Sequence, residues 1–369
     1  AGARRIRGEA GPPDRYVHER PERGTELGVQ ITGEEAVHGH SLPPDASEQI
    51  AGLCAAVFEK DIRQRNGFLS PGVSYAMDNC GMGGDLFVTA NVSTIAAFIA
   101  AAAGIPMCKH GSPANADEGR HGSSDFISLL GIDTCAGRDA VEKCVEELNF
   151  GYTEALDTNY KRIHQETHSF AKLPHMNDII GPITNPLHPA LLSRRVLGVN
   201  HLIDPMLVAR AYVILNRFGI TFVRHLLVVR GYFGGPYEGI GVDELLVCLG
   251  GSTMVELKYD PPNPPYSDGF EIQTRPVAGS DFGIAPVDFR YISPPYGMTK
   301  GDFSLKILRN EFPDPSYSYT VIANAAILFY LARRSSDLKE CFRMARDVYE
   351  SGAAYKKAMA VREMLPAAR

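Results

Sequence analysis

The sequence lacks the features that would place it at once in several common functional classes. It has no excess of positive charge: 37 basic and 43 acidic residues give a formal net charge of −6. The serine-hydrolase elbow Gly-x-Ser-x-Gly and the zinc-peptidase pattern His-Glu-x-x-His are absent. The longest apolar run, from about residue 92 to 105, is interrupted by two hydroxyl residues and is too short to span a bilayer. We therefore expect neither a membrane nor nucleic acid as a partner.

Paired cysteine patterns are missing as well. The seven cysteines are odd in number, and none of them shows the Cys-x-x-Cys spacing of a metal site. Scattered cysteines of this kind are typical of reduced thiols, so we expect a cytoplasmic protein. The eleven histidines show no zinc-binding spacing either.

The 369 residues, 44% of them apolar, are enough for two domains or one large one. Residues 1 to about 45 are polar and contain five of the prolines, and we expect an extended arm there. A first helix is expected over residues 45–65, because apolar residues repeat at helical spacing and Asp45 can cap it.

The most informative stretch runs from Cys80 to Thr94. A buried strand is expected before it, over residues 73–77, and an apolar helix after it, over residues 95–103, with Ser93 at the N-cap position together with Thr94. Three glycines let the backbone approach a ligand closely: Gly81, Gly83 and Gly84. Further polar residues belong to the same edge: Asp85, Thr89, Asn91, Ser93 and Thr94. We interpret the stretch as a cradle for phosphate or pyrophosphate; a tight strand-to-helix turn is the alternative.

The same order of strand, loop and helix follows a second time. A strand over residues 105–109 leads into Lys109-His110-Gly111, and a helix opens at Ser123. This repetition predicts an α/β fold with parallel strands, in which ligands bind off the carboxyl ends of the strands. Both loops would then lie at one edge of the sheet.

The remaining elements are less distinctive. Further helices are expected over residues 138–148, 158–172, 204–217, 321–333, 338–349 and 353–365. Further strands are expected over residues 196–200, 221–230 and 253–258. We expect a turn over residues 179–186 and irregular surface over residues 261–295, because both segments are rich in proline and glycine.

Charged and hydroxyl residues near these loops suggest phosphate chemistry. Lys109 directly after a strand can neutralise a phosphate as a point charge, although a solvated lysine is the alternative. Ser123 and Ser124 at a helix start can donate to a phosphate or simply cap the helix. Asp243-Glu244 offers the hard oxygen ligands that magnesium prefers, although the pattern by itself favours the alternative of a solvated acidic pair.

Four motifs in this order resemble the anthranilate phosphoribosyltransferase family, which is glycosyltransferase family 3. They are Gly81 to Thr94, Lys109-His110-Gly111 with Gly122-Ser123-Ser124-Asp125, Gly181-Pro182-Ile183-Thr184-Asn185-Pro186 with Leu197-Gly198-Val199, and Asp243-Glu244. The resemblance implies the nucleoside phosphorylase class II fold: a small helical domain and a larger α/β domain with a mainly parallel central sheet. The first would comprise residues 1–72, including the arm, with about 158–195, and the second residues 73–157 with about 196–369. It also implies a homodimer.

The resemblance further implies a glycosyltransferase, more specifically a pentosyltransferase, that uses phosphoribosyl pyrophosphate and Mg²⁺. Catalytic roles fall to Lys109, Asp243 and Glu244, and metal binding to Ser93, Asp243 and Glu244. The substrate would be bound by Gly81, Gly83, Gly84, Asp85, Thr89, Asn91, Ser93, Thr94, Lys109, His110, Gly111 and Ser123.

The chain departs from the family on the side of the acceptor. Ser112-Pro113 replaces the usual Asn-Arg, and an ungapped count places Pro174 where the family has an arginine that grips the anthranilate carboxylate. Proline offers no bidentate partner for a carboxylate. Nearby cationic residues are the possible substitutes: His168, Lys172 and His175.

Three functions are therefore compatible with the sequence. The first is a phosphoribosyltransferase for a small aromatic or heterocyclic acceptor other than anthranilate; turnover of anthranilate itself would instead assign the chain to tryptophan biosynthesis. The second is a nucleoside phosphorylase of the same fold. The third is a catalytically inactive, nucleic-acid-binding relative, which the acidic net charge and the retained Asp243-Glu244 pair disfavour.

Overall fold

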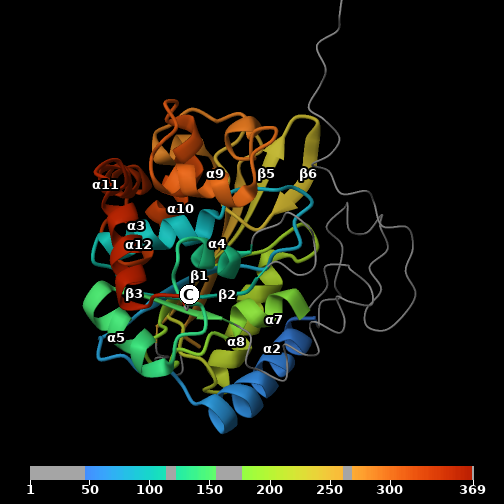
Figure 1. Cartoon of the computed structure of the whole chain (residues 1–369). Coiled ribbons are helices and arrows are strands. Elements are labelled where there is room, and N and C mark those ends of the chain that lie inside the picture. The colour runs from blue at the N-terminus through green and yellow to red at the C-terminus, as the bar shows by residue number, and fades with distance from the viewer. Residues whose placement is uncertain (1–45, 114–121, 155–176, 261–267, 368–369) are drawn as a thin grey trace, which may run out of the picture.

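A twisted sheet of eight strands forms the centre of the computed structural model, which describes residues 46–113, 122–154, 177–260 and 268–367 (Figure 1). The order along the sheet is β3-β2-β1-β4-β5-β7-β8, and β6 pairs with β5. The strands are β1 (Met77–Gly81), β2 (Met107–Gly111), β3 (Phe150–Glu154), β4 (Arg194–Gly198), β5 (His225–Gly234), β6 (Tyr237–Val242), β7 (Ser252–Tyr259) and β8 (Phe270–Val277). The first five are parallel, and β6, β7 and β8 join antiparallel. The predicted α/β class with a mainly parallel sheet is confirmed.

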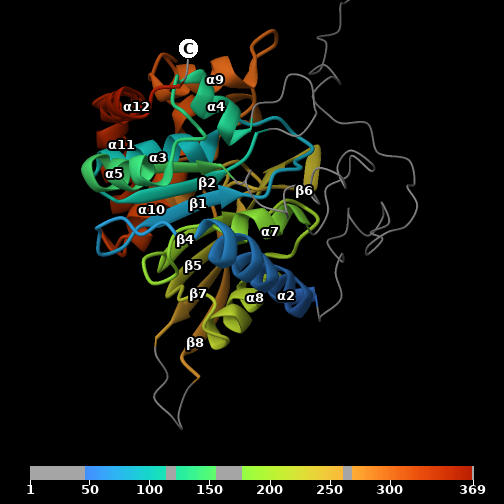
Figure 2. The ribbon, with the colours of Figure 1, turned by 60° about the horizontal axis from the view of Figure 1, so that its bottom comes forward.

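Helices cover both faces of this sheet (Figure 2). One face carries α3 (Val92–Ala102), α10 (Ser316–Leu331), α11 (Leu338–Glu350) and α12 (Ala353–Met364). The other carries α2 (Ala46–Val57), α7 (Asn177–Ile183) and α8 (Pro205–Arg217). Successive side chains of β5 point to opposite faces of the sheet, so Leu227 packs into the first core while its neighbour Leu226 packs into the second. Both faces of this strand are therefore buried under helices.

Further helices complete the described chain. They are α4 (Ser123–Leu129), α5 (Arg138–Leu148), α9 (Lys300–Leu308), a π-helix (Phe58–Asn66) that continues α2, and two 3₁₀ turns (Gly279–Phe282 and Phe289–Tyr291). Several predictions are confirmed: α5 has the expected bounds, and α8 begins after Asp204, whose carboxylate accepts from Met206 N at 2.9 Å. No helix in the described ranges is long and apolar enough to cross a membrane.

The strand before the glycines lies further along the chain than predicted. The expectation was residues 73–77, but β1 begins at Met77 and ends at Gly81. The polar residues Asp78 and Asn79 hid the strand, because they are buried through hydrogen bonds rather than through apolar character. The predicted cap was also wrong: Asn91 is the N-cap of α3, and Ser93 lies inside its first turn.

Prolines and glycines caused the other errors. The turn expected over residues 179–186 is helical up to Ile183, with Pro182 inside α7. The segment expected to be irregular contains β8, whose alternately exposed residues belong to an outer strand. The strand expected over residues 221–230 also lies further along the chain, because β5 runs from His225 to Gly234 and its glycine-rich end forms a hairpin with β6.

The division into two domains stays a prediction. The arm, including Asp45, and the helix expected over residues 158–172 lie outside the described residues. Within the described part, Ile50 of α2 shares one apolar core with α8 and with Leu197 of the sheet. The first helix therefore packs onto the α/β layer through α8, as Figure 2 shows.

Candidate active site

Three neighbouring strands bring their glycine ends to one edge of the sheet. β1 ends at Gly81, paired in register with Gly198 of β4, and β2 ends at Gly111. A Cβ on Gly81 would lie 2.1 Å from Asp243 Oδ2, and one on Gly198 would lie 1.6 Å from the Asp243 carbonyl oxygen. These two positions therefore need glycine so that the segment after β6 can press against the strand ends.

A cluster of three carboxylates results from this close approach. Ligand oxygens of Asp85, Asp243 and Glu244 all lie within 4.8 Å of one another. Asp243 N donates to Asp85 Oδ1 at 3.1 Å, and Thr89 Oγ1 donates to Glu244 Oε1 at 3.0 Å. The second oxygen of Glu244, Oε2, is buried without a hydrogen-bond partner in the described structure. Burial first, and then the charge of Asp243, raise the pKa values of Asp85 and Glu244 well above their usual range.

This geometry refines two interpretations of the sequence. Glu244 is only 9% exposed, so the alternative of a solvated acidic pair is wrong for it. Asp85 was predicted to bind substrate, and the structure places it in the carboxylate cluster. Oxygen ligands at these separations suit a divalent cation such as Mg²⁺.

The glycine loop is fixed by contacts to its backbone. Gly83 N donates to Asp243 Oδ2 at 2.6 Å, and Asn200 Nδ2 donates to the Gly83 carbonyl at 2.8 Å. Gly83 and Gly84 have φ of 74° and 70°, values that favour glycine. The role of Asn200 escaped the sequence analysis; its position just after β4, at the same edge, was the signal.

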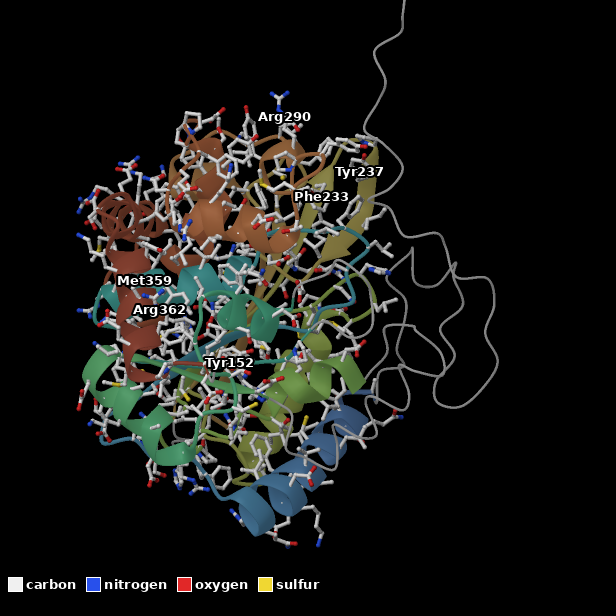
Figure 3. All side chains as sticks on the ribbon, in the orientation of Figure 1. Tyr152, Phe233, Tyr237, Arg290, Met359 and Arg362 are labelled. Atoms are coloured by element: carbon white, nitrogen blue, oxygen red, sulfur yellow. The ribbon has the colours of Figure 1, made fainter. Side chains whose placement is uncertain are left out.

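Aromatic packing holds the polar residues that follow the glycines. Phe87, between Asp85 and Thr89 in the chain, packs edge-on against Phe233 at 4.7 Å and against Tyr237 at 4.9 Å between ring centroids. Figure 3 shows these two partners together on the β5–β6 hairpin. The hairpin thus supports the loop from which Asp85 and Thr89 reach the cluster.

Lys109 is buried within β2, with 1% exposure, so the alternative of a solvated lysine is wrong. Its Nζ donates to the Asn79 carbonyl at 2.7 Å and to Ser93 Oγ at 3.1 Å. Burial lowers the pKa of Lys109, while nearby acidic groups, including Asp243 and Glu244, act in the opposite direction. The amine of Lys109 is therefore held at the start of α3, within the influence of the carboxylate cluster.

The other residues at the end of β2 form a separate group. His110 is buried, its N donates to Asp78 Oδ1 at 3.1 Å, and burial lowers the pKa of its ring to about 4. A Cβ on Gly111 would lie 1.9 Å from Ser123 Oγ. Ser123 Oγ in turn lies 3.1 Å from the hydroxyl of Tyr152, a central residue that the sequence analysis missed (Figure 3).

Two predicted residues face the helices. Asn91 donates to Ser304 Oγ of α9 through its backbone N at 2.8 Å and through Nδ2 at 3.1 Å. Thr94 is fully buried, and its Oγ1 has no hydrogen-bond partner among the described residues. Their roles toward a substrate, like that of Ser93 toward a metal, stay predictions.

A buried ion pair ties these elements together. Arg195 Nη2 lies 2.5 Å from Asp78 Oδ2, and Arg195 Nη1 donates to the Ile183 carbonyl at 2.8 Å and to the Tyr212 hydroxyl at 2.5 Å. The guanidinium also donates to the Pro182 carbonyl. The Gly-Pro-Ile segment is thereby fixed to β1, and through Asp78 to the backbone of His110.

The residues expected at the acceptor lie outside the described ranges, because these omit residues 155–176. They are Pro174 and its possible substitutes His168, Lys172 and His175. Ser112 and Pro113 are described, and Ser112 N donates to Ser123 Oγ at 3.2 Å.

Comparison with known sequences gives a consistent result. A family model described as the a/b domain of a glycosyl transferase family matches residues 74–355. The anthranilate phosphoribosyltransferase of Helicobacter pylori (strain G27) is 30% identical over 284 residues, which are 76% of this chain and 74% of that protein. The enzyme of the same name from Methanopyrus kandleri is 30% identical over 315 residues, 84% of this chain and 82% of that protein.

Solved structures share the fold. Anthranilate phosphoribosyltransferase from Saccharomyces cerevisiae in complex with PRPP and Mg superposes with a TM-score of 0.66 at 22% identity, covering 86% of this chain and 80% of that one. The protein of the same name from Thermus thermophilus gives a TM-score of 0.64 at 23% identity, covering 90% of this chain and 98% of that one. At these identities the likeness extends to the fold.

Proposed function

The chain belongs to the anthranilate phosphoribosyltransferase family of glycosyl transferases, and from this premise we propose that it is a magnesium-dependent phosphoribosyltransferase that uses phosphoribosyl pyrophosphate. The observation that carries the proposal is the carboxylate cluster of Asp85, Asp243 and Glu244 beside the glycine loop. A related solved structure, from Saccharomyces cerevisiae, is a complex with PRPP and Mg.

The cluster fits Mg²⁺ for two reasons. First, the unpartnered Glu244 Oε2 is a buried oxygen that a cation would satisfy. Second, the raised pKa values of Asp85 and Glu244 reflect mutual repulsion and burial, which a bound cation relieves. We assign Asp243 and Glu244 as ligands, with Asp85 beside them; Ser93 stays a predicted ligand. Bound Mg²⁺ would neutralise the charge of the departing pyrophosphate.

The chain's own residues position the donor. The amides after Gly81 and at the start of α3 can hold phosphate oxygens. Lys109, whose Nζ lies at the start of α3, would stabilise negative charge as the bond between the ribose carbon and pyrophosphate breaks. Its hydrogen bond to Ser93 Oγ fixes the ammonium before the donor arrives.

We further propose that the acceptor is a small aromatic or heterocyclic compound other than anthranilate. The support is Pro174 in place of an arginine and Ser112-Pro113 in place of Asn-Arg. A carboxylate entering the site would lose water without gaining a bidentate partner.

Calorimetric titration with phosphoribosyl pyrophosphate, with and without Mg²⁺, tests the central proposal. We expect the wild type to bind phosphoribosyl pyrophosphate only when Mg²⁺ is present. In Asp243→Asn, Mg²⁺ should no longer increase the affinity for phosphoribosyl pyrophosphate. Glu238→Gln, an exposed change on the neighbouring strand β6, is the matched control. Equal affinity with and without Mg²⁺ would contradict the proposal. Turnover of nucleosides with free phosphate, without any need for pyrophosphate, would favour the phosphorylase alternative. Homodimer formation and a cytoplasmic location stay predictions.

A further inference from the structure

A hollow lined by cationic side chains lies at the amino end of β5, whereas the glycine loop lies at the carboxyl ends of the parallel strands. It has a volume of about 340 Å³ and is lined mainly by Arg224, His225, Lys258, Tyr259, Tyr330 and Arg333. His225 begins β5, whereas further along the same strand a Cβ on Gly231 would lie 2.4 Å from the Glu244 carbonyl oxygen. Six residues of strand separate the two places, a distance of about 20 Å. The hollow is therefore separate from the carboxylate cluster.

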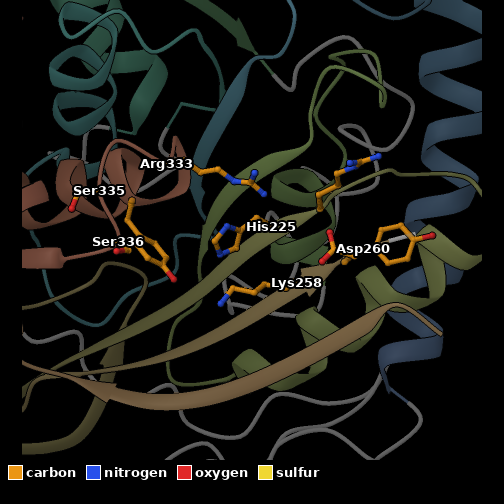
Figure 4. Close-up of a pocket in the computed structure, with 9 residues that line it drawn as sticks. His225, Lys258, Asp260, Arg333, Ser335 and Ser336 are labelled. Carbon is orange, nitrogen blue, oxygen red and sulfur yellow. The ribbon is translucent and has the colours of Figure 1, made fainter. Parts of the chain in front are cut away.

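Its side chains converge from three segments far apart in the sequence. Figure 4 shows Arg333, His225 and Lys258 around the hollow, with Asp260 at one side. Arg224 and His225 come from the start of β5, Lys258 from β7, and Arg333 from the end of α10. Arg333 has φ of 59°, a left-handed conformation in which the chain leaves the helix.

Glu256 contacts three of the side chains that line the hollow, and its carboxylate is already compensated by them. Glu256 Oε1 lies 2.6 Å from His225 Nε2 and 3.3 Å from Lys258 Nζ, and it accepts from the Tyr330 hydroxyl at 2.7 Å. Although burial opposes this, the hydrogen bonds from His225 and Tyr330 and the charges of His225 and Lys258 lower its pKa to about 2. Glu256 thus positions His225 and Tyr330 without engaging the two arginines.

Both arginines remain available to a ligand. Within the described ranges, neither Arg224 nor Arg333 forms an ion pair with a carboxylate. Among the described residues that line the hollow, Asp260 is the one with a carboxylate. Cations therefore outnumber carboxylates here, although the chain as a whole carries a net charge of −6.

We propose that this hollow binds a small organic anion, a carboxylate or phosphate on a compact ring or chain. Arginine side chains present paired donors that match both anions, and Tyr259 and Tyr330 supply ring surface for the body of the ligand. The volume is at the lower end of the range of small-molecule sites, which limits the ligand to the size of a metabolite. The site takes no part in the transfer reaction proposed above and stands independently of it.

Calorimetric titration of the full chain with inorganic phosphate and, separately, with benzoate tests the proposal, in buffer without Mg²⁺. We expect at least one probe to bind with a dissociation constant below about 10 mM, and Arg224→Gln and Arg333→Gln each to weaken it about tenfold or more. Both arginines are exposed, so these changes leave the core intact. Binding of phosphate alone would identify a phosphate site, and binding of benzoate alone a carboxylate site.

Two control variants show whether the probe binds at the hollow or elsewhere on the protein. Arg63→Gln removes another exposed arginine, from the π-helix, and binding should be unchanged. Lys109→Ala removes the cation of the glycine-loop site, and binding to the hollow should persist. Binding that survives both hollow variants but disappears in Lys109→Ala would overturn the proposal, as would the failure of both probes to bind.

Discussion

Replacement of Glu244 by glutamine should stabilise the protein in the absence of Mg²⁺ while it weakens Mg²⁺ binding. The change keeps the shape of the side chain and its ability to accept from Thr89 Oγ1, but it removes one of three clustered negative charges. Two unit charges 4.8 Å apart repel by about 3 kcal/mol at an effective dielectric constant of 20. The charge of Lys300 partly opposes the rise in the pKa values of Asp85 and Glu244. This compensation reduces the expected gain in the free energy of unfolding to about 1–2 kcal/mol.

The effect should depend on pH with a definite sign. A carboxyl whose pKa is higher in the folded than in the unfolded state binds more protons when folded, so stability falls as the pH rises between the two values. Asp85 and Glu244 both have raised pKa values. The stabilisation by Glu244→Gln should therefore be small near pH 4 and largest above the folded pKa of Glu244.

Thermal unfolding of the wild type and Glu244→Gln, at pH values from 4 to 8 with and without Mg²⁺, measures this. For a chain of 369 residues, the expected gain corresponds to about 1–3 °C in melting temperature without Mg²⁺. Mg²⁺ should raise the melting temperature of the wild type and of the control Glu238→Gln, but not that of Glu244→Gln. A Glu244→Gln protein that melts earlier without Mg²⁺ and responds normally to Mg²⁺ would refute the reasoning.

Three further predictions concern the donor, the metal and the acceptor. Lys109→Met should weaken binding of phosphoribosyl pyrophosphate about tenfold or more, measured by calorimetry, because it keeps most of the buried volume but loses the charge; normal binding would show that the lysine is structural. Gly81→Ala should abolish the Mg²⁺ response in thermal unfolding, because its Cβ would lie 2.1 Å from Asp243 Oδ2, whereas Gly52→Ala, with open space around it, should retain the response. Anthranilate should be a poor acceptor because of Pro174, and a kcat/KM above about 10⁴ M⁻¹s⁻¹ in a fluorescence assay would show otherwise.

The parts of the site that are local in sequence could be predicted, and the parts that arise from packing could not. Glycines between a strand and a helix act through backbone geometry within a few residues, so the loop at Gly83 was recognisable. The helix predicted over residues 204–217 likewise agrees with α8, Pro205–Arg217. By contrast, Asn200 reaches Gly83, and Ser304 reaches Asn91, across more than a hundred residues of chain. Such contacts depend on which strands become neighbours, which no local pattern specifies.

Burial of polar residues caused the largest errors. Asp78 and Lys109 look like surface residues in the sequence, yet both are buried because each has a partner of fitting chemistry. A polar residue inside β1 therefore ended the predicted strand too early, and a lysine inside β2 was given a solvated alternative. Partners that lie far away in the sequence cannot be inferred from hydropathy.

The close fit of residues 243–246 against the sheet restricts which positions of this chain tolerate substitution. A side chain at Gly81 or Gly198 would meet Asp243, and one at Gly231 would meet the Glu244 carbonyl at 2.4 Å and Leu246 Cγ at 2.5 Å. The acidic segment is thus clamped by three strands, whereas the tip of the β5–β6 hairpin at Gly235 has open space around it. Loop grafts or insertions at this tip should leave the positions of the carboxylates unchanged. The hairpin tip is therefore a position where the sequence can be varied without moving the residues of the site.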